Sequence, residues 1–245
     1  FSNYAAADNI TFEEINNAPK LADRQFMDRW IISTLQSLIK EVNEKMEGYY
    51  LYEVIPPLIS FIEELTNWYV RSNRRRFWKE KGEDDIDKIS AFATLHEVLI
   101  LFSKTLAPVL PFISETIYQN LSENKNESVH IQDFPEFNKG LIDVGLERDI
   151  DYAKEIIKLG RTIRLEIDTP NRQPLNELVI ITSDKRVTES IEITETLIKN
   201  ELNVKKINID NNEENWVKLV CKPNYAKLGP KFQKEIKKIV EFIEN

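Results

Sequence analysis

The stretch WIISTLQSLIKEV, residues 30 to 42, decides the fold class because its large apolar residues recur at helical spacing. Positions i, i+4, i+7 and i+11 share one face of an α-helix, and here they are Ile31, Leu35, Leu38 and Val42. The same spacing, with small offsets, recurs in residues 58–69, 92–102 and 110–121. Four amphipathic helices must bury their apolar faces against one another, so the sequence predicts a helical bundle between residues 21 and 121.

Helix-breaking and polar residues separate these four segments. Gly48 and the Pro56-Pro57 pair lie between the first two, residues 81–87 lie between the second and the third, and Pro108 with Pro111 precedes the fourth. Residues 122–140 are polar and rich in turn-forming types. We expect them to form a connector that crosses the surface of the bundle.

The pattern changes after the connector. A long helix is expected over about 142–167, because this region keeps a helical apolar period. Beyond it, the sequence predicts strands over residues 177–182, 204–209 and 216–221 and helices over residues 187–199 and 231–244. We therefore predict a mainly α chain: a helical-bundle domain with its connector at 1–140, then a long helix with a small α/β domain at 141–245.

The composition excludes several kinds of site. Two His, one Cys and two Met in 245 residues cannot supply an imidazole or thiolate cluster for zinc or iron, and no disulfide can close within the chain. Cys221 is expected to be a small buried residue in a reducing compartment. No apolar run approaches the roughly 18 to 20 residues of a membrane span. The chain does not begin with Met, so we expect a piece of a longer protein.

One short stretch contradicts the acidic character of the chain, whose formal net charge is −8. NWYVRSNRRRFWK, residues 67–79, holds five cationic side chains and two tryptophans without an acid. At 100° per residue, one set of side chains points away from the apolar face of this helix: Asn67, Arg71, Arg74 and Trp78. Arg75 borders that set. The opposite, buried face is predicted to hold Leu58, Phe61, Ile62, Leu65, Trp68 and Tyr69. Arg76 returns toward the core, where we expect it to pair with an acid or cap a neighbouring helix.

The outward-facing side chains suit looped RNA. Arg offers forked donors to phosphates and a flat cation to bases, and an exposed indole gives a base a surface on which to stack. The alternative interpretation is a solvated face, in which the arginines pair with the acids of residues 83–87 and Trp78 packs against the next helix.

NWYVRSNRRRFW (67–78), together with LAPVLPFISETIYQNL at 106–121, resembles the anticodon-binding helical domain of class I isoleucyl-tRNA synthetases. The valine and leucine enzymes look similar but keep the first motif less well. SVHIQDFPEFN at 128–138 resembles the segment that leaves that domain, so the likeness covers about residues 20–140. Residues 160–181 and 222–232 resemble the carboxy-terminal region of the eukaryotic and archaeal-type branch. The commoner bacterial branch ends in a cysteine-rich zinc module, which a chain with one Cys cannot form.

The resemblance implies a parent enzyme, an isoleucine–tRNA ligase that uses ATP with Mg. The HIGH-like and KMSKS-like signatures of its catalytic domain do not occur in these 245 residues. We therefore expect a fragment with no catalytic residues, no cofactor and no metal, which does not aminoacylate by itself. Its expected partners are the anticodon loop and stem of isoleucine tRNA and the rest of the synthetase chain. The resemblance further implies a cytoplasmic monomer without membrane contact.

Two groups of residues are predicted to contact RNA. The first comprises Arg71, Arg74, Arg75, Trp78, Asn67, Asn73 and Lys79. A possible secondary group comprises Arg161, Arg164, Arg172, Lys222 and Lys227, although cations near a helix end also stabilise that end without any ligand. His96 lies on an apolar face and is expected to be structural. Two alternatives stay open: the same domain of a valyl- or leucyl-tRNA synthetase, and a protein-interaction module whose basic face meets an acidic partner.

Overall fold

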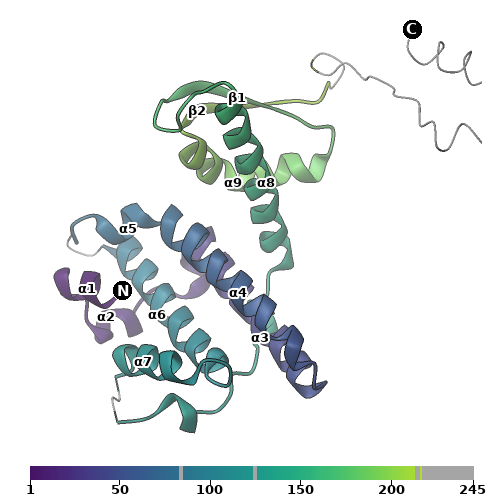
Figure 1. Ribbon diagram of the computed structural model, residues 1–245. Coiled ribbons are helices and arrows are strands. Elements are labelled where there is room, and N and C mark those ends of the chain that lie inside the picture. The colour runs from purple at the N-terminus through teal and green to yellow at the C-terminus, as the bar shows by residue number, and fades with distance from the viewer. Residues whose placement is uncertain (83–84, 124–125, 213–215, 217–245) are drawn as a thin grey trace, which may run out of the picture.

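The computed structural model describes residues 1–82, 85–123, 126–212 and 216, and its architecture is mainly α-helical (Figure 1). A helical bundle forms the amino-terminal part. A long helix leads from it to a second part with two strands and one helix. This arrangement confirms the predicted fold class, a bundle followed by a small α/β region.

The four predicted bundle helices are all present. They are α3 (Phe26–Glu47), α4 (Ile55–Glu63), α6 (Ile86–Leu106) and α7 (Pro111–Leu121). Their apolar faces form a core in which Ile31, Leu35 and Phe92 are completely buried. Two short helices, α1 (Ser2–Ala7) and α2 (Phe12–Asn16), precede them, and α2 packs against α6.

The second bundle helix departs from the regular α-helix assumed in the sequence analysis. After α4 the chain forms a π-helical segment, η3 (Glu64–Val70), and a turn at Asn73 separates this segment from the short α5 (Arg74–Trp78). Ile62 was predicted to be buried but is 39% exposed. The buried face is centred on Leu58, Phe61 and Leu65, so Ile62 lies at its edge.

The connector crosses the surface of the bundle, as predicted, and it bonds to α3. It contains two short 3-10 turns, η4 (Val129–Ile131) and η5 (Lys139–Leu141). The Asn43 amide donates to the Pro135 carbonyl at 3.0 Å, and the Gln36 side-chain oxygen accepts from the Asn138 backbone N–H at 2.7 Å. These bonds attach the connector to the outer side of α3.

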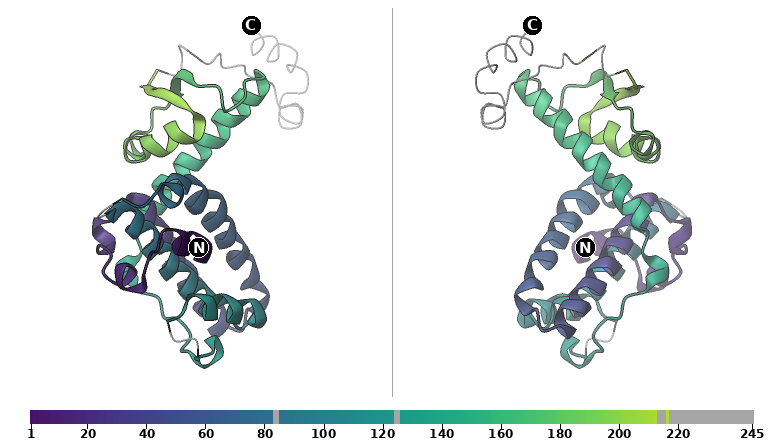
Figure 2. Two further views of the ribbon diagram at one scale, coloured as in Figure 1. Left: turned by 90° about the vertical axis from the view of Figure 1, so that its left-hand side faces the viewer. Right: turned by 90° about the vertical axis from the view of Figure 1, so that its right-hand side faces the viewer.

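The carboxy-terminal part is built on α8 (Val144–Glu166), which extends away from the bundle (Figure 2). Strands β1 (Leu175–Ile181) and β2 (Val204–Asp210) pair in parallel, with α9 (Lys185–Leu202) as the crossover between them. A Cβ added at Gly160 would lie 2.5 Å from a Leu202 methyl carbon, so α8 and α9 approach closely there. The predicted strand at 216–221, apart from Trp216, and the predicted helix at 231–244 lie outside the described residues.

Helix α8 belongs to both parts of the molecule. It packs against both α3 and α9, and one continuous cluster of buried residues runs through all three helices. The Lys154 ammonium lies 4.8 Å from the Trp30 ring centre and 5.8 Å from that of Trp68, and it pairs with Glu64 at 2.6 Å. The division into 1–140 and 141–245 stays a prediction.

By length and composition α6 could cross a membrane, and it is the one helix among the described residues that meets this test. The sequence expectation that no stretch approaches a membrane span is therefore corrected. Most of this stretch is buried, because α6 packs against α3 on one side and α7 on another. This environment is that of a core helix in a bundle.

Candidate nucleic-acid interface

A buried network fixes the inner side of α5. Arg76 makes a two-pronged contact with Asp28, at 2.8 and 2.7 Å, and pairs with Asp87 at 2.9 Å. The Tyr69 hydroxyl donates to the same Asp28 at 2.7 Å. Burial lowers the pKa of Arg76, but the nearby acids raise it by more, and Asp28 contributes most of that increase. The net pKa of Arg76 is therefore raised, and the side chain stays a cation. The prediction that Arg76 pairs with an acid is confirmed.

Asn73 and Lys88 complete this inner network. The Asn73 amide donates to the Tyr69 carbonyl at 2.8 Å and accepts from Arg76 at 3.0 Å. Asn73 is buried, because the turn before α5 directs its side chain inward, so we remove it from the candidate interface. The Lys88 ammonium pairs with Asp8 at 2.5 Å and donates to the carbonyls of Phe77 and Lys79. These two carbonyls flank Trp78, so Lys88 holds the backbone on both sides of that indole.

The outer side of α5 presents the cations and the indole to solvent. We call this the α5 surface and define it by its exposed residues, Asn67, Arg71, Arg74, Arg75, Trp78 and Lys79. Trp78 is 51% exposed, and the Arg74 guanidinium carbon lies 3.6 Å from the centre of its ring. The helical phase deduced from the sequence therefore placed these side chains correctly.

The members of the α5 surface differ in whether they form ion pairs. Within the described residues, Arg74 and Arg75 make no ion pair, and Arg71 approaches the Glu201 carboxylate at 4.0 Å. Lys79 pairs with Asp85 at 2.9 Å. Pairing with the neighbouring acids, the alternative interpretation, therefore applies to Lys79 and to the buried Arg76, whereas Trp78 does not pack inside.

A hollow of about 340 Å³ opens beside Trp78. Its floor includes Val70 and Phe77, and its rim includes Arg71 and Arg74. The Tyr4 ring from α1 lies 6.4 Å from the Trp78 ring at 31° between planes. Sequence reasoning missed Tyr4, because α1 is far from α5 along the chain and no local pattern connects them.

The secondary group of predicted contacts divides. Arg164 is buried and donates to the carbonyls of Leu202 at 2.6 Å and Pro170 at 3.2 Å, so it stabilises the end of α9 and leaves the candidate interface. Arg161 is half-buried and bonds to Glu201, and Arg172 is exposed. Lys222 and Lys227 lie outside the described residues.

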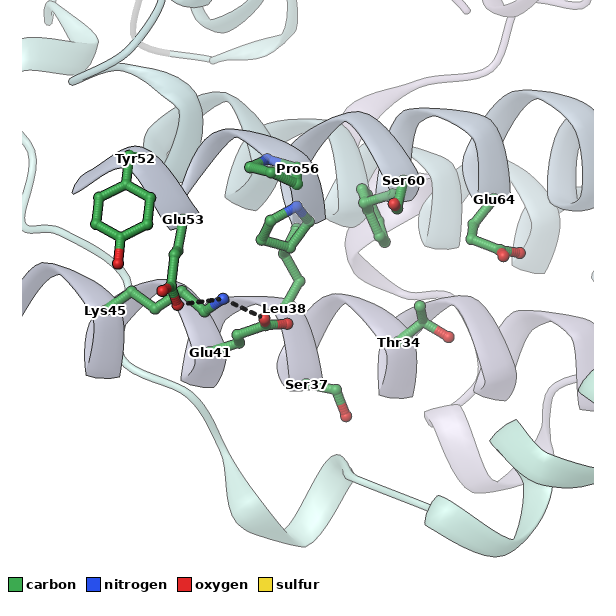
Figure 3. A pocket seen from close by; sticks show the side chains of 12 residues that line it. Thr34, Ser37, Leu38, Glu41, Lys45, Tyr52, Glu53, Pro56, Ser60 and Glu64 are labelled. Carbon is green, nitrogen blue, oxygen red and sulfur yellow. Dashed lines mark ion pairs between the residues drawn. The ribbon is translucent and has the colours of Figure 1, made fainter. Parts of the chain in front are cut away.

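A second groove lies elsewhere, between α3 and α4 (Figure 3). Its volume is about 630 Å³, and Lys45 stands in it between two carboxylates, Glu41 at 2.9 Å and Glu53 at 3.4 Å. Glu64 lies at the other end. Three acids and one base repel phosphate, so this groove is a poor site for a nucleic acid.

His96 has a structural contact. Its Nε2 lies 2.8 Å from the Leu121 carbonyl, which ties α6 to the end of α7. Among the described residues, no group of three or more His, Cys, Asp or Glu side chains is arranged to hold a metal ion. The chemistry that the described surface offers is therefore ionic contact and stacking at α5.

Comparison with known proteins gives a consistent result. Residues 28–180 match the family model described as the anticodon-binding domain of tRNA ligase. The isoleucine–tRNA ligase of Chlamydia trachomatis serovar L2 is 44% identical over 206 residues, 84% of this chain and 20% of that protein. The isoleucine–tRNA ligases of Chlamydia caviae and Protochlamydia amoebophila are 40% and 39% identical over 98% and 97% of this chain, and each match covers 22% of the relative. The chain thus spans about a fifth of the length of these relatives.

Proposed function

The chain belongs to the family of anticodon-binding domains of tRNA ligases, and we propose that its α5 surface holds the anticodon loop of isoleucine tRNA. The matched residues include nearly all of the bundle and all of α8, so α5 lies well inside the family domain. Isoleucine is proposed because the relatives that cover nearly all of this chain carry that name.

The observation that carries the proposal is the Arg74–Trp78 pair. Its indole is 51% exposed and its guanidinium has no ion pair with a described residue, so both retain binding capacity. Bases in an RNA loop are unstacked and can pack on aromatic rings or on Arg planes. The neighbouring Arg71 and Arg75 supply charge for the phosphates of the same loop.

Aminoacylation is proposed for the longer protein of which this chain is a part. That protein would join isoleucine to its tRNA with ATP and Mg, in a catalytic domain outside these 245 residues. We further propose that the protein is a cytoplasmic monomer and that this part needs no cofactor. The contribution of the chain is then to fix the anticodon end while the acceptor end reaches the active site.

The test measures binding of an isoleucine-tRNA transcript to the 245-residue chain. Trp78→Ala and Arg74→Ala should each weaken binding about 5- to 150-fold, since stacking on a base contributes roughly 1 to 3 kcal/mol. Their matched controls are Tyr49→Ala, which removes an 87% exposed ring at the far end of α3, and Arg29→Ala, an exposed arginine on α3. Thermal unfolding should stay unchanged in all four variants.

The alternatives are outcomes of the same experiment. Equal binding of valine or leucine tRNA would contradict isoleucine specificity while leaving the site intact. Unchanged tRNA affinity in both Trp78→Ala and Arg74→Ala would refute the site and leave the α5 surface to a protein partner.

A further inference from the structure

We propose that a groove between η3 and α8 binds one further nucleotide of the same RNA. The groove has a volume of about 480 Å³ and is lined by Trp68, Lys154, Glu155, Lys158, Arg161 and Leu165, among others. The base or ribose would lie against Trp68 and Leu165, and the phosphate would meet Lys158 and Arg161. This inference rests on the function proposed for the α5 surface and extends it to a second site.

The apolar wall of the groove is unusual for a solvated helix. Leu165 is 82% exposed, and Trp68 from η3, which also lines the groove, is half-buried. A leucine and an indole that line one open groove leave apolar area in contact with water until a flat group fills the space. A nucleobase or a ribose has a suitable shape, and stacking on an indole tolerates any base.

The rim of the groove is cationic. Lys158 is exposed and makes no ion pair with a described residue. Arg161 bonds to Glu201 through one terminal nitrogen, so its other donors stay available. Lys154 is already paired with Glu64 and Asp151. Glu155 is the one acid among the residues that line the groove, so the cations that remain to meet a phosphate are Lys158 and the free donors of Arg161.

The groove adjoins the α5 surface through one carboxylate. A Glu201 oxygen contacts Arg161 of the groove and lies 4.0 Å from Arg71 of the α5 surface. The Ser72 hydroxyl donates to the other Glu201 oxygen at 2.9 Å. Because both arginines approach the same carboxylate oxygen, their guanidinium groups lie close together, and we expect one RNA strand to reach both. This continuity favours RNA over an acidic peptide as the occupant.

The sequence contains a signal for this site. Lys154, Lys158, Arg161 and Leu165 follow steps of 4, 3 and 4 residues, and so do Asn67, Arg71, Arg74 and Trp78 on the α5 side. In both sets cationic side chains precede one large exposed apolar side chain. Sequence reasoning found Arg161 but missed Lys158 and Leu165.

The test places a negative charge in the groove without disturbing the core. Leu165→Glu should weaken binding of a hairpin transcript of the anticodon stem and loop about tenfold, because a carboxylate repels the phosphate and displaces the stacked group. The matched control is Leu159→Glu, which makes the same change on the same helix at a 64% exposed position outside the groove. Both variants should melt like the unaltered chain.

A second pair of variants tests the phosphate contact. Lys158→Ala should reduce the slope of log affinity against log salt by about 0.7 to 1, as one lost phosphate contact does. Lys139→Ala removes an exposed lysine from the connector and should leave that slope unchanged. A nucleotide protection map should lose, in Leu165→Glu, positions next to those lost in Trp78→Ala.

The two proposals fail in different ways. If Trp78→Ala weakens binding while Leu165→Glu and Leu159→Glu behave alike, the groove is not an RNA site and the function of the α5 surface stands. A protein partner would then be the remaining candidate occupant of the groove. If Trp78→Ala and Arg74→Ala are also without effect, the proposed function itself is refuted.

Discussion

The arginines of α5 and those at the end of α8 differ in their environments, although both sets lie on helices. Arg74 and Arg75 point outward and make no ion pair with a described residue, whereas Arg164 is buried against carbonyls from α9 and the loop before β1. Arg76, next to Arg75 in the chain, resembles Arg164, because Asp28 is within reach. Whether a guanidinium is structural or available therefore depends on the acceptors that the fold places beside it, not on its neighbours in sequence.

The largest expected effect comes from removing an inward-facing arginine. Arg76→Ala leaves Asp28 buried without its cation, and breaking a buried ion pair in this way costs about 3 to 5 kcal/mol. Urea denaturation followed by circular dichroism should show this loss in the free energy of unfolding.

The neighbouring residue supplies the control for that loss. Arg75→Ala, one position earlier and exposed, should change the unfolding free energy by less than about 0.5 kcal/mol. If Arg76→Ala loses less than about 1 kcal/mol of unfolding free energy, the inward-facing arginine is not structural in the sense proposed here.

Arg164→Ala should have the next largest effect, and it should be local. The substitution removes charged donors from the carbonyls of Leu202, Pro170 and Gln173, and hydrogen bonds from a charged group contribute about 1.5 to 3 kcal/mol. Amide hydrogen exchange should accelerate in β1, β2 and the end of α9.

The unaffected region makes this prediction specific. Exchange in α3 and α6 should stay slow, and tRNA affinity at the α5 surface should be retained, because Arg164 does not belong to that surface. If affinity falls while exchange in the sheet is unchanged, Arg164 acts on RNA and its structural assignment fails.

The bundle was predictable because apolar spacing is a local property of the chain. The apolar spacing of residues 30–42 and 92–102 predicts α3 and α6 without reference to the helices that pack against them. The π-helical turn in η3 and the exposure of Ile62 were not predictable, since they depend on how the second helix fits against its neighbours. The same holds for the direct contact of Gly160 with Leu202.

The site was predictable to the extent that exposure follows from helical phase. Arg74 and Trp78 point outward as expected, whereas Asn73 turns inward because the chain bends immediately before α5. Lys88 was missed, since its acceptors lie on other elements: Asp8 near α1 and the carbonyl of Phe77 in α5. Local pattern thus identifies candidate side chains, and long-range contacts decide which of them are already occupied.

Replacing Arg74 with lysine should sharpen the comparison within the α5 surface itself. Lysine keeps the charge but not the planar group that stacks 3.6 Å from the Trp78 ring centre. Because lysine removes the plane on which a base packs, the loss in tRNA binding free energy should be about 1 kcal/mol, the lower end of the range for stacking on a base.

Arg75→Lys is the matched variant, because Arg75 has no ring contact among the described residues, and it should bind nearly as well as the unaltered chain. Fluorescence titration at two salt concentrations measures both variants. Equal losses would mean that charge alone matters at these two positions.

The smallest expected effect on stability concerns the ion pair of Lys79 with Asp85. Lys79 is exposed like Arg74, but like Arg76 it pairs with an acid. Burial raises the pKa of Asp85, but the Lys79 hydrogen bond and the Lys88 backbone N–H outweigh it, so the net pKa is lowered. A carboxylate whose folded pKa lies below its unfolded value stabilises the fold above about pH 4, and this contribution is lost as the pH falls through the folded pKa.

Asp85→Asn keeps a good helix cap and removes the charge. The variant should therefore lose less than about 1 kcal/mol of unfolding free energy at pH 7, and the difference should narrow below pH 4. A difference that is the same at pH 7 and pH 3 would show that Lys79 is not held by this carboxylate, and would place Lys79 with the available cations of α5.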